Sequence, residues 1–151
     1  MKWLIDGYNV LISNELGHDN SARERFRRLI EAYFSGKQVE VTIVYDSRGS
    51  ITIQRERLTS SISAVYVDNA DQYIIDMIEG SSHPRSIILV TDDRDIVQAV
   101  RDLRPQRRST AEFLSLITPS YSHGWEEKKP ERETQGNIER YLSLFDMESD
   151  D

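Results

Sequence analysis

The chain alternates short apolar runs with amphipathic segments, and this order constrains its fold more than any other feature. Apolar runs rich in branched side chains predict four strands, at Lys2–Asp6, Val39–Asp46, Ile62–Val67 and Ser86–Thr91. Apolar residues at helical spacing predict four helices, at Ala22–Phe34, Ala70–Glu79, Asp93–Leu103 and Ala111–Ile117. The alternation predicts an α/β fold in which helices cover both faces of a mostly parallel sheet.

The 151 residues are enough for one domain with a short appendage, and the composition changes after Pro119. Residues 1–119 form the expected domain. Residues 120–151 hold nine acids and four bases of a chain whose net charge is −7, and they predict an acidic linker followed by a helix. An apolar stripe predicts that helix at about Asn137–Met147. We expect it to dock on its own domain; the alternative is a groove on a partner protein or on a second copy.

Several function classes lack their usual signatures. Without cysteine there is no disulfide framework or thiolate metal site, so the cytoplasm is the expected location. Asp6 interrupts the first apolar run, which therefore predicts neither a signal peptide nor a membrane span. Neither a phosphate-binding Gly-x-x-x-x-Gly-Lys loop nor a Gly-x-Gly-x-x-Gly turn is present. None of His18, His83 and His123 accompanies a nucleophile elbow, which argues against a serine hydrolase.

Acidic residues recur where strands end and the next helices begin. Asp6 and Asp46 end predicted strands, and Asp71, Asp93 and Asp95 open predicted helices. Because the ligand crevice of an open α/β sheet lies outside the carboxyl ends of its strands, these acids should converge. Crowded carboxylates repel one another unless a cation neutralises them. A set of oxygen ligands favours Mg²⁺ or Mn²⁺, which can bind a phosphate oxygen and activate water.

Each acid also has a structural interpretation. The competing role of Asp6-Gly7 is a strand-to-loop turn. At the next helix the alternative is an N-cap at Asp68 or Asn69, with Asp71 favoured in the first turn by the helix dipole. At the last site it is an N-cap at Thr91 or Asp92, with Asp95 as the partner in a capping box. Capping explains one acid at a time, whereas the acids recur along the whole sheet. The pattern therefore favours a metal site.

Four motifs in order, "DGYNVL", "VYDSRG", "NADQYIIDMI" and "VTDDRDI", resemble those of the YacP-like branch of NYN domains, in the PIN-like ribonuclease superfamily. The resemblance covers about Met1 to Ile117. It implies a PIN-like three-layer α/β/α sandwich and a metal-dependent endoribonuclease that hydrolyses RNA phosphodiester bonds.

The resemblance also implies roles for individual residues. Asp6, Asp71 and Asp93 are the expected metal ligands. Asn9, Asp46 and Asp95 complete the expected catalytic set. Asp92 occupies a position that is often filled by a small residue, so its role stays open.

Arginines supply the expected contacts to RNA, either single-stranded or ribosome-associated. Thirteen of the fifteen basic residues in 1–119 are arginines, and they cluster at residues 23–28, 48–57 and 101–108. Arg48, Arg55 and Arg57 follow Asp46 in a polar loop and are the expected phosphate ligands. Solvated surface positions are the alternative. At the level of function, the alternatives are a catalytically silent RNA- or ribosome-binding module and a toxin-like nuclease controlled by a partner.

Overall fold

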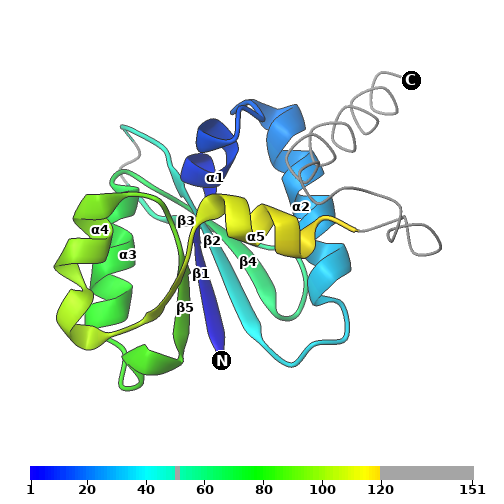
Figure 1. Cartoon of the computed structure of the whole chain (residues 1–151). Helices are drawn as coiled ribbons and strands as arrows, with labels where there is room; N and C mark the ends of the chain where they lie inside the picture. The colour runs from blue at the N-terminus through cyan, green and yellow to red at the C-terminus, as the bar shows by residue number, and fades with distance from the viewer. Residues whose placement is uncertain (50–51, 120–151) are drawn as a thin grey trace, which may run out of the picture.

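The structure, a computed structural model, describes residues 1–49 and 52–119. Six strands, β1 (Lys2–Asp6), β2 (Glu40–Asp46), β3 (Gln54–Arg57), β4 (Ile62–Val67), β5 (Ile87–Val90) and β6 (Gln106–Arg108), form one sheet in the order β3-β4-β2-β1-β5-β6. Only β3 runs antiparallel to its neighbour (Figure 1). The expected linker, the helix near 137–147 and His123 lie outside the described residues.

Helices cover both faces of the sheet. Helices α1 (Gly7–Ser13), α2 (Asn20–Phe34) and α5 (Thr110–Ile117) lie on one face, and α3 (Ala70–Glu79) and α4 (Arg94–Ala99) on the other (Figure 1). Two 3₁₀ turns, η1 (Pro84–Ser86) and η2 (Arg101–Leu103), complete the described elements. The expected α/β architecture is confirmed.

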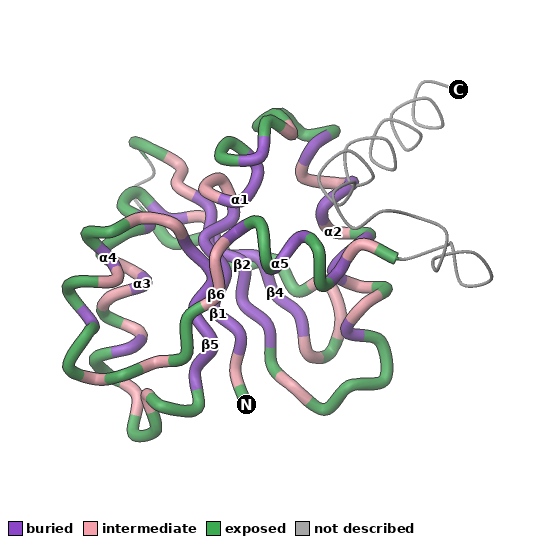
Figure 2. Tube along the Cα trace, in the orientation of Figure 1, coloured by how far each residue is buried: buried purple, intermediate pink, exposed green. Residues whose placement is uncertain are grey.

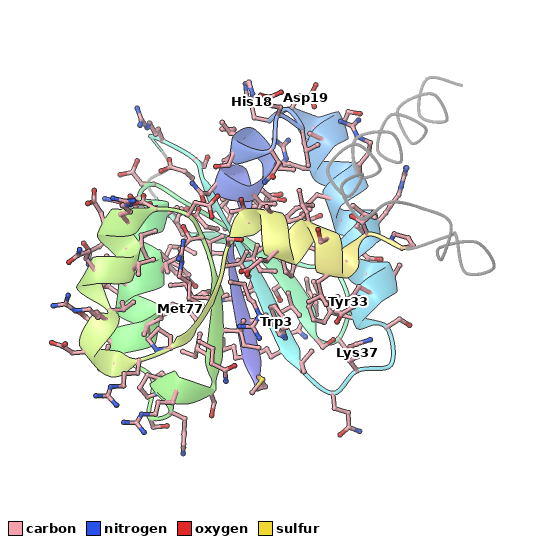
Figure 3. The ribbon with its side chains drawn as sticks, in the orientation of Figure 1. Trp3, His18, Asp19, Tyr33, Lys37 and Met77 are labelled. Carbon is pink, nitrogen blue, oxygen red and sulfur yellow. The ribbon has the colours of Figure 1, made fainter. Side chains whose placement is uncertain are left out.

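Side chains alternate between the two faces of each strand, as the pleat requires. In β1, Trp3 and Ile5 pack beneath α1, α2 and α5, whereas Leu4 packs with α3 and α4. Trp3 is labelled in Figure 3. Its ring lies 5.3 Å from that of Phe34 and 5.6 Å from that of Phe113. The strands at the centre of the sheet are accordingly buried on both faces (Figure 2).

The structure contains elements that the sequence patterns did not predict. Helix α1 follows β1 directly, where a polar loop was expected, and β3 and β6 are short edge strands in predicted loops. The predicted helix at Asp93–Leu103 is two pieces, because α4 ends at Ala99 and η2 follows. Both edge strands are polar and largely exposed, and each is defined by hydrogen bonding to one neighbouring strand. Because neither has alternating apolar residues, the sequence did not predict them.

Gly7 allows α1 to begin directly after β1. A Cβ atom at this position would lie 2.7 Å from Cδ1 of the Tyr45 ring and 3.1 Å from Cγ2 of Ile43. Only glycine therefore lets the first turn of α1 pack this closely on β2.

We predict that Gly7→Ala lowers the free energy of unfolding by about 1–3 kcal/mol, because the Tyr45 ring must move. Urea unfolding monitored by circular dichroism measures this change. Ser13→Ala, at an exposed position of the same helix, is the matched control and should change stability by less than about 0.5 kcal/mol. Equal stability of Gly7→Ala and wild type would contradict the close packing.

Candidate active site

The parallel strands bring the expected acids to one edge of the sheet. Asp6 is in register with Val44, and Asp46 with Val67, so both acids lie at carboxyl ends. Each acid lies two residues after a residue of the core under α3 and α4, Leu4 or Val44, and therefore points to the same face of the sheet. Because β1 lies between β2 and β5, the chain leaves the centre of the sheet in both directions, and open α/β sheets place their ligands at such a point.

Asp6 is a buried carboxylate at the centre of this edge. Asp6 is only 7% exposed, and its Oδ2 accepts a hydrogen bond of 3.0 Å from the Thr91 hydroxyl. Although Asp6 precedes the first residue of α1, its side chain makes no capping hydrogen bond. A capping role therefore does not explain this acid.

The electrostatics place several acids around one site. Burial raises the pKa of Asp6 to about 7; the Thr91 hydrogen bond opposes this, and the charges of Asp71, Asp93 and Asp46 add to it. Burial and the neighbouring Asp93 likewise raise the pKa of Asp71, with smaller contributions from Asp46 and Asp95. Asp6 and Asp71 thus each lie close enough to Asp46 and Asp93 for repulsion, and Asp71 lies close enough to Asp95 as well.

The helix caps distinguish structural acids from available ones. Asn69 caps α3 by accepting from Gln72 N, and Asp71 lies in the first turn of this helix, as the structural alternative anticipated. Asp93 caps α4, with Oδ1 accepting from Asp95 N at 2.9 Å. The alternative in which Thr91 or Asp92 caps α4 is wrong, because the helix begins at Arg94, one residue later than that assignment requires.

Asn9 and Thr91 hold the turn after β5. Oδ1 of Asn9 accepts a hydrogen bond from Asp92 N at 2.7 Å and lies 3.4 Å from the Thr91 hydroxyl oxygen, whose single proton it shares with the nearer Asp6. The Thr91 hydroxyl oxygen also accepts from Asp93 N at 3.0 Å. Thr91 was absent from the predicted site, and its one sequence signal is that it shares the strand parity of Leu89, which faces the same side.

Asp92 has a structural role that its sequence position left open. Its two carboxylate oxygens accept from Thr110 N at 3.0 Å and from the Thr110 hydroxyl at 2.6 Å. The Thr110 hydroxyl in turn accepts from Asn14 Nδ2 at 3.0 Å. Asp92 therefore joins the start of α5 to the turn after β5 and to the end of α1.

The three expected RNA-contacting arginines are exposed but do not lie together. Arg48 follows β2 at the carboxyl edge, in a turn where Gly49 N donates to Asp68 Oδ1. Arg55 donates to the Tyr73 hydroxyl on the α3 side. Arg57 is in register with Ser63 and bonds Ser60 O, so it lies towards the amino ends of the parallel strands, away from the acids.

The chemistry of the donors fits a hard divalent cation. Oδ1 of Asp46 is buried and has no hydrogen-bond partner in the described part of the chain, a costly state for a carboxylate oxygen. All the candidate ligands are oxygens, as Mg²⁺ and Mn²⁺ prefer. Within residues 1–49 and 52–119 no three acidic, histidine or cysteine side chains are already close enough to hold an ion, so the carboxylates would have to draw together around it.

The fold and its edge of acids define a PIN-like α/β/α domain. The model of the YacP-like NYN domain family matches residues 3–149, and the chain belongs to this family. The match extends past Ile117, where the resemblance was expected to end, and takes in most of the residues that follow. Membership of this family indicates a nuclease-type, RNA-related function.

Solved structures agree with the fold. The crystal structure of Rae1 (YacP) from Bacillus subtilis superposes with a TM-score of 0.60 at 18% identity, covering 99% of this chain and 83% of that one. A single-substitution mutant of the same Bacillus subtilis protein gives 0.60 at 17% identity, covering 93% and 99%. The comparison with curated protein sequences gives no significant match.

The described residues include no helix that is long and apolar enough to cross a membrane.

We predict that Asp6→Asn changes the pH dependence of stability in EDTA. Because the folded pKa is about 7 and the unfolded value 3.8, wild type loses stability as pH rises between them, and Asn does not. Between pH 4 and pH 7.5, the free energy of unfolding of the variant should rise relative to that of wild type by on the order of 4 kcal/mol. Urea unfolding at several pH values measures this difference.

Asp76→Asn removes an exposed carboxylate from α3 and is the matched control for this experiment. Its stability should follow the wild-type curve. Parallel curves for Asp6→Asn and wild type would show that Asp6 does not sit in the repulsive, buried environment described above.

Proposed function

We propose that this protein is a metal-dependent endoribonuclease that hydrolyses RNA phosphodiester bonds at its aspartate centre. The observation that carries the proposal is the convergence of Asp6, Asp46, Asp71 and Asp93: burial raises the pKa of Asp6 to about 7, and the charges of the other three acids add to this rise. A binding module has no use for such mutually repelling charges, whereas a cation site requires them. The substrate is RNA, single-stranded or ribosome-associated, and the location is the cytoplasm.

Asp6, Asp71 and Asp93 would hold the ion. Oδ1 of Asp46, which has no hydrogen-bond partner in the described residues, would be a further ligand. When bound, Mg²⁺ or Mn²⁺ supplies charge for a phosphoryl oxygen and acidifies a water for in-line attack. Thr91 fixes the orientation of Asp6 through its 3.0 Å hydrogen bond. Asn9 fixes the turn that carries Asp93, so its role is positioning.

The remaining predicted residues act around this centre. Asp95, exposed in the first turn of α4, adds negative charge next to Asp71. Arg48 and Arg55 lie nearer the carboxyl edge than Arg57 does and are the better placed of the three to contact phosphates. The segment 120–151 is proposed to dock on the domain or to bind a protein partner.

We expect Asp93→Asn to reduce RNA cleavage by at least about 100-fold. Asparagine still caps α4, so the variant should stay folded. Gel assays with single-stranded and structured RNAs, in Mn²⁺, Mg²⁺ or EDTA, measure cleavage, and the melting temperature in Mn²⁺ measures ion binding. Asp76→Asn is the control. Asp76 is exposed on α3, the helix that also carries Asp71, but it lies outside the centre, so this variant should cut normally.

Wild type should cut only with metal, and Mn²⁺ should raise its melting temperature more than that of Asp93→Asn. Cleavage that persists in Asp93→Asn would refute the assigned centre. If wild type cuts no RNA and Mn²⁺ does not stabilise it, a catalytically silent RNA-binding module is the correct function.

A further inference from the structure

One edge of the sheet is strongly basic. Residues 101–108, which form η2 and β6, include four arginines and a single aspartate. We call these residues, Arg101, Arg104, Arg107 and Arg108, the β6 arginine edge. Among the described strands, β6 pairs with β5 alone, so its outer side faces away from the sheet.

The β6 arginine edge adjoins the aspartate centre. Arg108 is in register with Val90 at the carboxyl end of β5, and Arg107 with Leu89, whose side chain belongs to the core under α3 and α4. Nε of Arg107 donates to Thr91 O at 3.3 Å. The hydroxyl of the same threonine bonds Asp6, so a single residue separates the guanidinium from the centre.

The guanidinium of Arg107 is anchored but still accessible. Its side chain is 46% exposed, and its Nη2 lies 3.9 Å from Oδ1 of Asp92, a long contact between charges. Because Asp92 already accepts two hydrogen bonds from Thr110, it does not saturate the arginine. The planar donor fork of Arg107 is therefore oriented by Thr91 and available to a phosphate.

The side chains of Arg101 and Arg104 have no structural partner in the described residues. Both are exposed, and neither makes a side-chain hydrogen bond or an ion pair there. Arg104 also adopts the left-handed conformation, with φ 58° and ψ 47°, which costs a non-glycine residue about 1 kcal/mol. Packing thus gives no reason for arginine at these positions.

The opposite edge of the sheet is less suited to phosphate. In β3, Glu56 separates Arg55 from Arg57, and both arginines already donate within the domain, to Tyr73 and Ser60. The β6 arginine edge has the higher charge. Arg107 and Arg108 also donate to backbone carbonyls, those of Thr91 and Arg107, but Arg101 and Arg104 make no side-chain bond in the described residues.

We propose that the β6 arginine edge binds the phosphate backbone of an RNA strand next to the bond that the aspartate centre cleaves. This inference rests on the proposed function and specifies where the substrate lies. RNA is favoured over an acidic protein segment because the edge continues directly into the centre through Arg107 and Thr91.

The test measures binding separately from cleavage. The full chain is titrated with a fluorescein-labelled single-stranded RNA in EDTA, at several NaCl concentrations. Arg104→Gln/Arg107→Gln should weaken binding about tenfold or more at low salt and reduce the slope of log K against log[NaCl] by about 1–1.5, as expected for two lost phosphate contacts. Arg107→Lys, which keeps the charge, should retain most of the salt slope.

Arg85→Gln/Lys37→Gln removes the same charge from exposed positions before β5 and β2, at the amino ends of these strands, and is the matched control. Its affinity should change by less than about twofold. Unfolding curves of both double variants verify that they are folded. Equal losses in the two double variants would mean non-specific attraction and would overturn the proposal.

Other outcomes separate this inference from the proposed function. If wild type cleaves RNA while Arg104→Gln/Arg107→Gln binds it normally, the nuclease function stands and the β6 arginine edge is not its RNA surface. If wild type neither binds nor cleaves RNA, both fail. The last measurement titrates the protein with a synthetic peptide of residues 120–151. If Arg104→Gln/Arg107→Gln no longer binds this peptide but still binds RNA, the edge binds an acidic segment and the proposal is wrong.

Discussion

Mutual repulsion among carboxylates at the carboxyl edge of the sheet is the constraint on which the site depends. Parallel strands deliver Asp6 and Asp46 to one level, and the starts of α3 and α4 bring Asp71 and Asp93 beside them. Folding must hold these charges together against their Coulomb energy, and the buried core on both faces of the sheet supplies the stability that permits it. In the proposed function, a bound cation would relieve this repulsion.

The turn after β5 connects the site to the rest of the domain. Asn9 in α1 binds this turn from one side, while Asp92 within the turn binds Thr110 at the start of α5. Two helices of one layer are therefore fastened to the segment that positions Asp93. The neighbouring acids of "TDDRD" have different functions for this reason: Asp92 faces the helices, and Asp93 faces the site.

Most of the fold and of the acidic site could be predicted because both leave periodic signals. Buried strands are apolar, and an acid at the end of such a strand stands out. The sequence did not reveal β3 and β6, because these strands depend on pairing with other strands of the sheet. It also did not reveal that α1 follows β1 without a loop, because this depends on the contact of Gly7 with Tyr45. Thr91 was missed because a threonine ending a strand is unremarkable until its hydroxyl is seen to reach Asp6.

The two edge strands have a consequence for how the protein behaves in concentrated solution. Exposed strand edges can pair with other chains and start aggregation, and long apolar edges are the most prone to do so. Here β3 has four residues and β6 three, and arginines occupy both. Two copies that approached edge to edge would bring like charges together. The sheet is thereby protected from extending into a neighbouring molecule, although its six strands form no closed barrel.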